Sequence, residues 1–343
     1  MTKNMKIAFF TPFIKQNRGN ATTAKRIIAG LQSAQIEVTV YAYEEDKLTA
    51  EKAAELQACS VFHILHITRF LQWKSAHQFD LNKPYIITNG GTDVNHDLLK
   101  VNDGSLLEFL ERASAICVFT DDAKKKISNL IEHSNIVTIP QSVWFPEETT
   151  SFQPPSKDGY PKVLLPAGLR KVKDVFFLVE ELSKLRSIYS NMRFVIAGIL
   201  IEAEVYEELI QYQQKYPWLS FCEDIPLDGM KKMYEWADVV LNTSISEGQA
   251  SSILEAMKIG SVVFARRNPG NESVITDNVN GFLFSTKDEF FQKIRALLEN
   301  QAKHQQVIEK AKDYIESHHS HSSEVQRYIS VYRQSIREAN FND

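Results

Sequence analysis

The chain has 343 residues, of which 43% are hydrophobic and 24% are charged, and its formal net charge is −4. This length is enough for two domains, and the composition is typical of a soluble globular protein. The small negative charge argues against bulk attraction to nucleic acid or anionic membranes, and no apolar run approaches the roughly 18 residues of a membrane-spanning helix.

The cysteines and the start of the chain indicate the cellular compartment. Cys59, Cys117 and Cys222 are odd in number, lack C-x-x-C spacing and lie in apolar stretches. These features predict buried free thiols in a reducing compartment, with a catalytic thiol as the alternative. Residues 1–4 lead directly into a strand-like run without the apolar segment of a signal peptide. We therefore expect a cytoplasmic protein.

The first part of the chain alternates between short apolar runs and helical patterns. Six runs are predicted to be strands, at residues 5–13, 36–43, 61–66, 84–88, 115–120 and 135–140. Such alternation predicts a doubly wound parallel sheet. Ligands bind at the carboxyl ends of the strands in such sheets, so the residues that follow each run are candidates for a site.

The segment after the first predicted strand contains Gly19, Asn20 and Thr23 and leads into a helix. Asn20 is expected to be the N-cap of this helix. A glycine-bearing loop before a helix N-terminus is a candidate anion site. The pattern G-x-G-x-x-G is absent, so a plain strand-to-helix turn is an equally good interpretation.

Two further strand ends carry polar residues. His66 and Arg69 follow the third predicted strand, where a structural histidine is the alternative interpretation. The fourth strand is followed by a turn that could face the same ligand or simply cap a helix. The residues of this turn are Gly90, Gly91, Thr92 and Asp93.

Residues 146–160 interrupt the alternation with prolines, acids and hydroxyl side chains, and they predict an inter-domain linker. A second alternating series follows, with strands predicted at 162–167, 194–198, 218–222, 237–242, 261–265 and 280–284. Its first strand is followed by Arg170, Lys171 and Lys173, which suit a diphosphate or form a solvated charge run. Arg266 and Arg267 are interpreted as solvated, with a phosphate contact as the alternative.

Two glutamates lie eight positions apart around the start of a predicted helix. Residues 239–242 predict a buried strand, a turn follows at Glu247, and a helix is expected from near Gln249 to Ile259. The helix N-terminus can bind phosphate, and Glu255 lies about 9 Å further along the helix axis. One carboxylate could therefore contact each side of a bound diphosphate, although a surface glutamate and a capping glutamate would give the same spacing.

The two glutamates and the basic segment together resemble the E-x7-E and phosphate motifs of retaining group-1 glycosyltransferases, which have the GT-B architecture. The resemblance implies that Glu247 contacts the donor sugar, Glu255 the ribose, and Lys173 with Arg170 the diphosphate, while His66 faces the donor sugar. Arg170 departs from the motif because it precedes Lys173 by three positions instead of five. We list Glu247, His66, Lys173 and Arg170 as candidate catalytic residues. The other candidate donor-binding residues are Gly248, Gln249, Ala250, Ser251, Ser252, Glu255 and Ile225.

The resemblance also implies the organisation of the chain. We expect two Rossmann-like doubly wound domains that face a cleft. Residues 1–145 would be the acceptor domain, 146–160 the linker and 161–320 the donor domain, and a helix at 321–343 would return to the first domain. Candidate acceptor or phosphate contacts are Gly19, Asn20, Thr23, Arg69, Gly90, Gly91, Thr92 and Asp93.

The expected activity is transfer of a hexose-type sugar from a nucleotide diphosphate, with UDP the commoner choice, to an unknown acceptor. By resemblance the stereochemistry would be retained. Neither a metal nor a cofactor is expected, since the cations and the helix end would stabilise the leaving diphosphate. His318, His319 and His321 lack an acidic or cysteine partner at ligand spacing. Alternatives on the same fold are a selenosugar synthase, a nucleotide-sugar epimerase or a non-catalytic nucleotide-sugar-binding protein.

Overall fold

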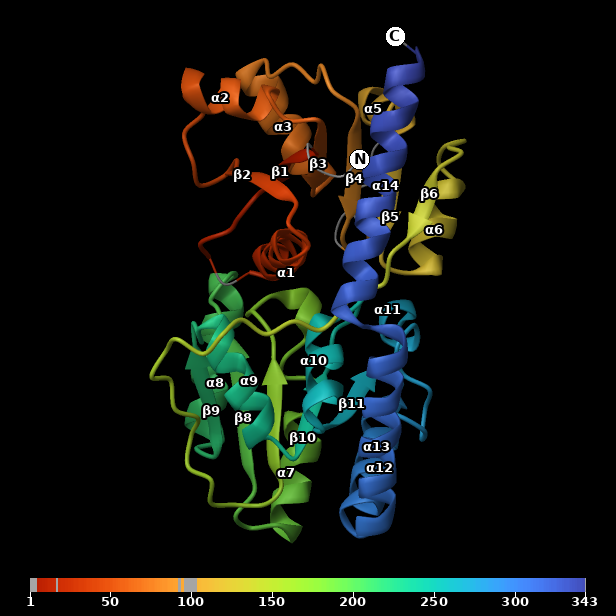
Figure 1. The fold of residues 1–343 in the computed structure, drawn as a ribbon. Coiled ribbons are helices and arrows are strands. Elements are labelled where there is room, and N and C mark those ends of the chain that lie inside the picture. The colour runs from red at the N-terminus through yellow and green to blue at the C-terminus, as the bar shows by residue number, and fades with distance from the viewer. Residues whose placement is uncertain (1–4, 17, 92–93, 96–103, 343) are drawn as a thin grey trace. The chain divides into compact units, whose positions relative to one another are not determined.

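The computed structural model describes residues 5–16, 18–91, 94–95 and 104–342 (Figure 1). It divides the chain into two compact units. Unit 1 comprises Met1–Gln141 together with His321–Asp343, and unit 2 comprises Ser142–Ser320. The strands of both units occur where the sequence predicts them, to within two residues at each end. Among the described residues, no helix combines the length and apolarity needed to cross a membrane.

Unit 1 contains a sheet of six parallel strands in the order β2-β1-β3-β4-β5-β6. Because both faces of a parallel sheet are covered, its strands are almost continuously apolar. The chain order reverses between β1 and β3, which makes their carboxyl ends the switch point of this sheet. The strands are β1 Lys6–Thr11, β2 Glu37–Ala42, β3 Val61–Leu65, β4 Tyr85–Asn89, β5 Ala115–Val118 and β6 Ile136–Thr138.

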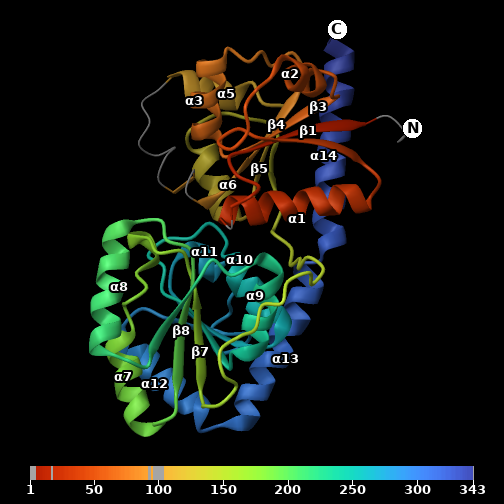
Figure 2. The ribbon, with the colours of Figure 1, turned by 90° about the vertical axis from the view of Figure 1, so that its left-hand side faces the viewer.

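Helices cover both faces of this sheet. One face packs against a core that contains residues of α3, α5 and α6, whereas α1 and α14 contribute to the core on the other face (Figure 2). The helices described in unit 1 are α1 Gly19–Ser33, α2 Ala50–Gln57, α3 Ile67–His77, α5 Gly104–Glu111, α6 Asp121–Ser128 and α14 His321–Asn342. The prediction that a C-terminal helix returns to the first domain is therefore confirmed.

Helix α14 is attached to unit 1 by buried polar contacts as well as by its apolar face. Arg26 Nε of α1 lies 3.0 Å from Glu324 Oε2, and the two side chains are 3% and 1% exposed. On the sheet, His63 Nδ1 lies 2.6 Å from the Tyr332 hydroxyl and its Nε2 lies 2.8 Å from Thr88 Oγ1. Burial lowers the pKa of His63 to about 3, so the imidazole is neutral in the folded protein.

Unit 2 contains a second sheet of six parallel strands, in the order β12-β11-β10-β7-β8-β9. When counted from β7, this is the 3-2-1-4-5-6 order of the Rossmann fold, and its switch point lies between β7 and β10. The strands are β7 Lys162–Pro166, β8 Arg193–Gly198, β9 Leu219–Glu223, β10 Val239–Asn242, β11 Val262–Arg266 and β12 Phe282–Phe284.

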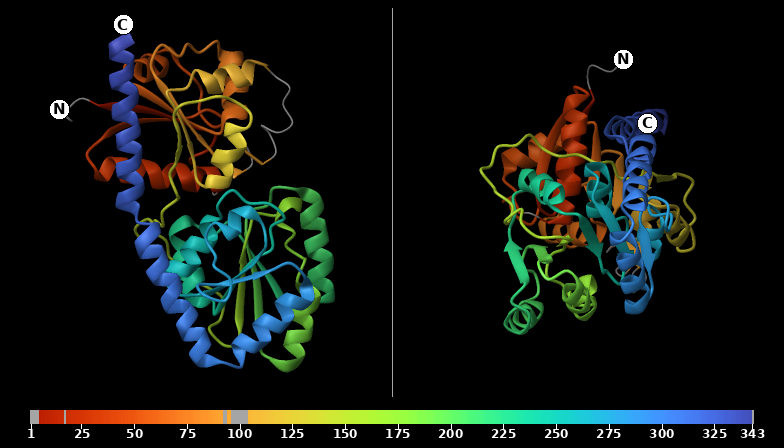
Figure 3. Two further views of the ribbon diagram at one scale, coloured as in Figure 1. Left: turned by 90° about the vertical axis from the view of Figure 1, so that its right-hand side faces the viewer. Right: turned by 90° about the horizontal axis from the view of Figure 1, so that it is seen from below.

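Helices also cover both faces of the second sheet. Residues of α7, α8 and α12 pack on one face, and residues of α9, α10 and α13 pack on the other (Figure 3). The helical segments of unit 2 are η2 Lys171–Lys173 (a 3-10 turn), α7 Val179–Ile188, α8 Ala203–Lys215, α9 Leu227–Trp236, α10 Ser251–Ile259, α11 Pro269–Glu272, α12 Lys287–Leu298 and α13 Gln301–His318.

The segment before β7, whose composition predicts a linker, lies against α9 of unit 2. The Asp228 carboxylate accepts hydrogen bonds from the backbone N–H of Thr149 at 2.7 Å and of Thr150 at 2.8 Å. These bonds lower the pKa of Asp228 to about 2. The indole N–H of Trp236 donates to the carbonyl of Ser156 at 2.9 Å. Hydrogen bonds to one helix therefore hold this extended segment on unit 2.

All three cysteines carry free thiols, as the sequence predicts. Cys59 and Cys117 are buried, and burial raises the pKa of the Cys117 thiol to about 12. Cys222 differs from the prediction because it is only half-buried on β9. Burial nevertheless raises the pKa of Cys222.

Candidate active site

The switch point of unit 2 brings together two loops that are distant in the chain. Strands β7 and β10 are hydrogen-bonded neighbours, with Val163 paired to Val239. At its carboxyl end, β7 leads into the 3-10 turn η2, and β10 leads through a turn into α10. At a switch point, the connections after the two adjacent strands pass to opposite faces of the sheet. The crevice between them is where open parallel sheets bind ligands. The basic segment and the first glutamate of the E-x7-E motif therefore share one edge of the sheet.

Lys173 and Glu247 form the ion pair at the centre of this edge. Lys173 Nζ lies 2.6 Å from Glu247 Oε1, and the side chains are 25% and 11% exposed. Asn242 Nδ2 donates to the same carboxylate oxygen at 3.2 Å. Burial raises the pKa of Glu247, but the charge of Lys173 and the hydrogen bonds outweigh it and leave the pKa below its usual value. The site thus pairs the Lys173 side chain with a Glu247 carboxylate that is ionised at neutral pH.

Backbone contacts fix the two loops against each other. Thr243 Oγ1 donates to the carbonyl of Lys173 at 2.8 Å, and the N–H of Ile245 donates to the carbonyl of Val172 at 2.9 Å. Asp174 has a left-handed backbone conformation, with φ of +43°, and ends the 3-10 turn immediately after Lys173. The position of the Lys173 ammonium is therefore set by the fold of unit 2.

Sequence reasoning missed a second ion pair that supports this turn. Arg266 Nη1 lies 2.7 Å from Asp174 Oδ2, and its guanidinium lies 4.2 Å from the centroid of the Phe177 ring. The interpretation of Arg266 as a solvated side chain is wrong, since β11 carries it to the same sheet edge as β7. Arg267 pairs instead with Glu272 at 2.9 Å on the surface. Only the strand order could have distinguished these adjacent arginines.

The second glutamate of the motif lies inside α10. Glu255 is 8% exposed, and the Tyr234 hydroxyl donates to its Oε2 at 2.7 Å. Burial and the charge of Glu255 raise the pKa of Tyr234 well above its usual value, so the phenol remains a donor. Tyr234 comes from α9, and no pattern near the motif identifies it.

Helix α10 begins two residues later than the sequence predicts. Its first residue is Ser251, and Ala250 occupies the N-cap position in an extended conformation without a side-chain cap. Gln249 therefore lies in the turn before the helix. Alanine has no side-chain acceptor, so the N-cap residue does not bind the N–H groups of the first turn through its side chain. Another acceptor, such as an anion, can therefore bind these N–H groups.

The remaining donor-site candidates lie at the same end of unit 2 but have different partners. Arg170 Nε lies 3.8 Å from Glu202 Oε1, after β8, so Arg170 and Lys173 pair with different carboxylates. Ile225 is 5% exposed and belongs to the core on the α9 face of the sheet. Because its side chain lies in the core, Ile225 has only backbone groups with which to contact a donor, as the resemblance implies for this loop.

Unit 1 has its own cluster of cations at the β1–β3 switch point. The guanidinium carbons of Arg18 and Arg69 lie 4.4 and 5.6 Å from the centroid of the Phe13 ring. The N–H groups of Ile14 and Lys15 each donate to Glu45 Oε2 at 2.9 Å, which anchors the loop that carries Phe13. Sequence reasoning found Arg69 but missed Arg18, because the two residues meet only in the folded sheet.

The start of α1 corrects one prediction. The helix begins at Gly19, and the extended residue Arg18, not Asn20, occupies the N-cap position without a side-chain cap. Asn20 lies in the first turn of the helix. Thr23 is buried, and its hydroxyl lies 3.5 Å from Gln141 Oε1. Gly19 has open space where a side chain would project, so a ligand could approach the backbone there.

His66 lies directly after β3 in an unusual conformation. Its φ is +71°, a left-handed value that costs free energy for a residue with a Cβ and that is enriched at functional sites. The side chain is 7% exposed, and Nδ1 lies 3.3 Å from the hydroxyl of Thr68. Asn89, at the end of the adjacent strand β4, is buried, and among the described residues neither of its side-chain polar atoms has a hydrogen-bond partner. Gly90 and Gly91 follow it, whereas Thr92 and Asp93 lie outside the described residues.

The histidines near the end of the chain bind backbone groups. His318 Nδ1 lies 3.0 Å from the carbonyl of Tyr314, and His321 Nε2 lies 3.0 Å from the carbonyl of Arg26. Across the part of the chain that the structure describes, no three His, Cys, Asp or Glu residues form a group that could hold a metal ion.

Glycosyltransferases are among the known proteins whose sequences resemble this chain. The family model for group 1 glycosyl transferases matches residues 146–314. Glycosyltransferase 1 domain-containing protein 1 of Xenopus tropicalis is 27% identical over 347 residues, covering 95% of this chain and 97% of that protein. Lipopolysaccharide 1,2-N-acetylglucosaminetransferase of Salmonella typhimurium is 27% identical over 181 residues, covering 48% and 46% of the two chains.

Solved structures have the same fold. Anabaena HepE in complex with UDP-glucose superposes with a TM-score of 0.75 and 16% identity, covering 99% of this chain and 100% of that one. Sucrose-phosphate synthase from Thermosynechococcus elongatus gives a TM-score of 0.75 and 15% identity, with coverage of 96% and 99%. Two Rossmann-like units with these neighbours define the GT-B fold. Within that fold, the chain is a glycosyltransferase that is similar to the group 1 family over residues 146–314.

Proposed function

We propose that the protein transfers a hexose-type sugar from UDP to an acceptor hydroxyl, with retention of configuration and without a metal. The observation that carries this proposal is the Lys173–Glu247 pair at the β7–β10 switch point, directly before the uncapped start of α10. Cations and a helix N-terminus suit a diphosphate, and a carboxylate suits sugar hydroxyls. The UDP-glucose complex of Anabaena HepE supports the choice of nucleotide.

The roles of the residues follow from the charge that develops during transfer. The bond between the sugar C1 and the diphosphate oxygen breaks, a bond from C1 to the acceptor oxygen forms, and the acceptor proton leaves to the released diphosphate or to solvent. Lys173 and the α10 N-terminus stabilise the negative charge on the diphosphate. Glu247 accepts hydrogen bonds from the sugar hydroxyls, and Glu255, oriented by Tyr234, accepts those of the ribose.

Unit 1 supplies the residues that we assign to the acceptor. Arg18 and Arg69 place two guanidinium groups next to Phe13 at the switch point of that sheet, and His66 follows the adjacent strand. Two arginines suit an acceptor that carries a negative charge. His66 and Asn89 would then bind its polar groups.

A thermal-shift screen tests the donor assignment directly. A ligand that binds only the folded protein raises its melting temperature, so UDP-sugars should raise the Tm more than GDP- or ADP-sugars. Glu255→Ala should raise the Kd of UDP at least about tenfold, equivalent to about 1.4 kcal/mol. Glu247→Ala should lower kcat by about 10²–10³ while the Kd of UDP changes less.

Glu299→Ala, a substitution of an exposed glutamate that pairs with Arg295, is the matched control and should leave both quantities unchanged. Wild-type behaviour of both Glu247→Ala and Glu255→Ala would refute the site. Tight UDP binding without UDP release, for any acceptor tested, would indicate a binding protein instead of a transferase. Product analysis with UDP-N-acetylglucosamine, in the presence and absence of selenophosphate, separates transfer from epimerisation and from selenosugar synthesis.

A further inference from the structure

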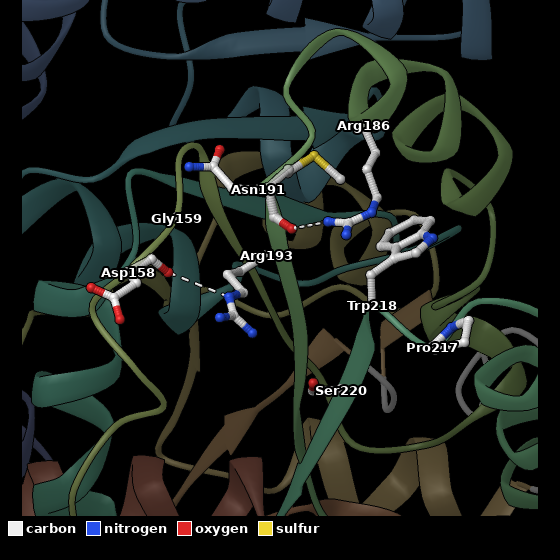
Figure 4. Close-up of a pocket in the computed structure, with 9 residues that line it drawn as sticks. Asp158, Gly159, Arg186, Asn191, Arg193, Pro217, Trp218 and Ser220 are labelled. Carbon is white, nitrogen blue, oxygen red and sulfur yellow. Dashed lines mark hydrogen bonds between the residues drawn. The ribbon is translucent and has the colours of Figure 1, made fainter.

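Unit 2 contains a pocket lined by two arginines, at the opposite edge of its sheet from the candidate active site (Figure 4). The pocket has a volume of about 550 Å³ and lies where β8 and β9 begin. A six-residue strand spans about 20 Å, which separates this pocket from the carboxyl ends of the strands. The lining residues are Asp158, Gly159, Arg186, Asn191, Met192, Arg193, Pro217, Trp218 and Ser220.

Two arginines face this pocket without a carboxylate partner. Arg186 Nη1 donates to the carbonyl of Met192 at 2.6 Å, and Arg193 Nε donates to the carbonyl of Asp158 at 3.3 Å. Within unit 2, all of whose residues the structure describes, neither guanidinium forms an ion pair. The only acidic side chain of the lining, Asp158, accepts a hydrogen bond from Ser156 at 2.9 Å and points away from Arg193 in Figure 4. The pocket therefore presents uncompensated positive charge.

Trp218 gives the pocket a flat apolar wall. Its indole packs against Tyr216 and Phe194, with ring centroids 5.5 and 6.3 Å away, so its orientation is fixed. The Arg186 guanidinium carbon lies 5.9 Å from the indole. Figure 4 shows Trp218 and Arg186 on one side of the pocket and Arg193 on the other. A rigid indole next to cations suits a ring that bears an anionic group.

The opposite wall depends on one glycine. Gly159 has a φ of +109°, and a Cβ at this position would lie 2.4 Å from the carbonyl oxygen of Asn191. Only glycine permits this close approach without strain. The approach places the carbonyl of Asp158 where it accepts the Arg193 hydrogen bond. The Arg193 side chain is thereby oriented by the backbone, while its terminal nitrogen atoms remain available for a ligand.

We propose that this pocket binds a phosphate monoester carried on a sugar or nucleoside ring. A phosphate dianion suits two guanidinium groups better than a carboxylate ligand does, because it carries two charges and each guanidinium can donate two parallel hydrogen bonds to it. The ring stacks on Trp218, and the polar groups of Asn191 and Ser220 bind its hydroxyls. The site is separate from the donor site, and it does not depend on which sugar the enzyme transfers.

Isothermal titration calorimetry with the full-length protein tests this site. Glucose 6-phosphate and AMP are the probes for the two ring types, with glucose and inorganic phosphate as partial ligands. At least one monoester should bind with a Kd of about 1 mM or tighter, equivalent to about −4 kcal/mol, and more tightly than either partial ligand. Saturating UDP should leave this binding unchanged, because the two sites lie at opposite edges of the sheet.

The variant Arg186→Gln/Arg193→Gln should raise the Kd of the bound monoester at least tenfold while UDP binding stays as in the wild type. Arg295→Gln, an exposed arginine on α12, is the matched control and should change neither. If the double variant does not fold, Arg193→Gln alone provides the test, since the Arg193 side chain is exposed and, within unit 2, donates to the carbonyl of Asp158.

Three results would overturn the proposal. They are the absence of monoester binding at millimolar concentration, displacement of the monoester by UDP, and an unchanged Kd in the folded arginine variants. If the wild-type protein did not bind UDP, the proposed donor site would be contradicted but this pocket would not. The two assignments therefore fail by different measurements.

Discussion

Lys173 and Glu247 lie 74 positions apart in the chain, yet their charged atoms are 2.6 Å apart. Each residue follows one of the two strands that meet at the switch point of unit 2, so the strand order creates the pair. The pair is only partly exposed, and a bound diphosphate would share the lysine with the carboxylate. The carboxyl ends of β7 and β10 therefore carry the positive and the negative charge that binding of the proposed donor requires.

We predict a strong coupling between these two residues. Lys173→Met should destabilise the protein by about 1–3 kcal/mol, because it leaves the Glu247 carboxylate with only part of its hydrogen bonding. Glu247→Gln in the same chain should recover most of this loss, since the amide carries no charge. Urea unfolding of the wild type, both single variants and the double variant measures the coupling. Strictly additive effects would show that the pair is not formed in solution.

Gly270 supports the turn that carries Glu247. A Cβ on Gly270 would lie 2.4 Å from the carbonyl oxygen of Glu247, and backbone atoms cannot move away as easily as the end of a side chain. Gly270→Ala should therefore displace Glu247 and lower kcat by about tenfold or more, since small misplacements are costly at an active site. Gly104→Ala is the control, because its added Cβ would have no other described residue within 4 Å apart from its chain neighbours and its own helix. Equal activity of the two variants in steady-state assays would contradict this role.

Tyr234 should act on nucleotide binding through Glu255. Tyr234→Phe removes the hydroxyl that donates to Glu255 at 2.7 Å and leaves the buried ring in place. We expect the Kd of UDP to rise by about three- to tenfold, equivalent to about 1 kcal/mol, which is less than the effect of Glu255→Ala. Calorimetry with UDP measures both values. A larger effect of Tyr234→Phe than of Glu255→Ala would mean that the tyrosine contacts the nucleotide itself.

His63 should make the stability of unit 1 depend on pH. Its pKa is about 3 in the fold, compared with about 6.5 in an unfolded chain, so the unfolded state takes up the proton first as the pH falls. The stability from neutral His63 is complete above about pH 6.5 and declines by about 1.4 kcal/mol per pH unit as the pH falls toward 3. Urea unfolding between about pH 6.5 and pH 4 should show this slope.

Two variants isolate the contribution of His63. His63→Gln should reduce the slope, because glutamine does not titrate in this range. His318→Gln, at an exposed position, should keep it. A wild-type slope in His63→Gln would show that other groups carry the pH dependence.

The sequence by itself determined the local structure and located the motif that we propose as the donor site. Apolar runs identified the strands of both sheets to within two residues at each end, because a buried parallel strand must be apolar on both faces. The spacing of Glu247 and Glu255 and the basic run before Lys173 indicated a phosphate-binding edge. These signals are local: helix and strand geometry permits a phosphate site at these residues, and the resemblance to group-1 glycosyltransferases assigns it.

Only the tertiary structure decided which side chains meet. Asp174 and Arg266, Glu255 and Tyr234, and Arg18 and Arg69 come from elements that strand order or helix packing brings together. Adjacent arginines such as Arg266 and Arg267 have the same local pattern, yet one supports the site and the other pairs on the surface. The physical reason is that residue type and spacing fix what a side chain can do, whereas its partners depend on contacts between segments far apart in the chain.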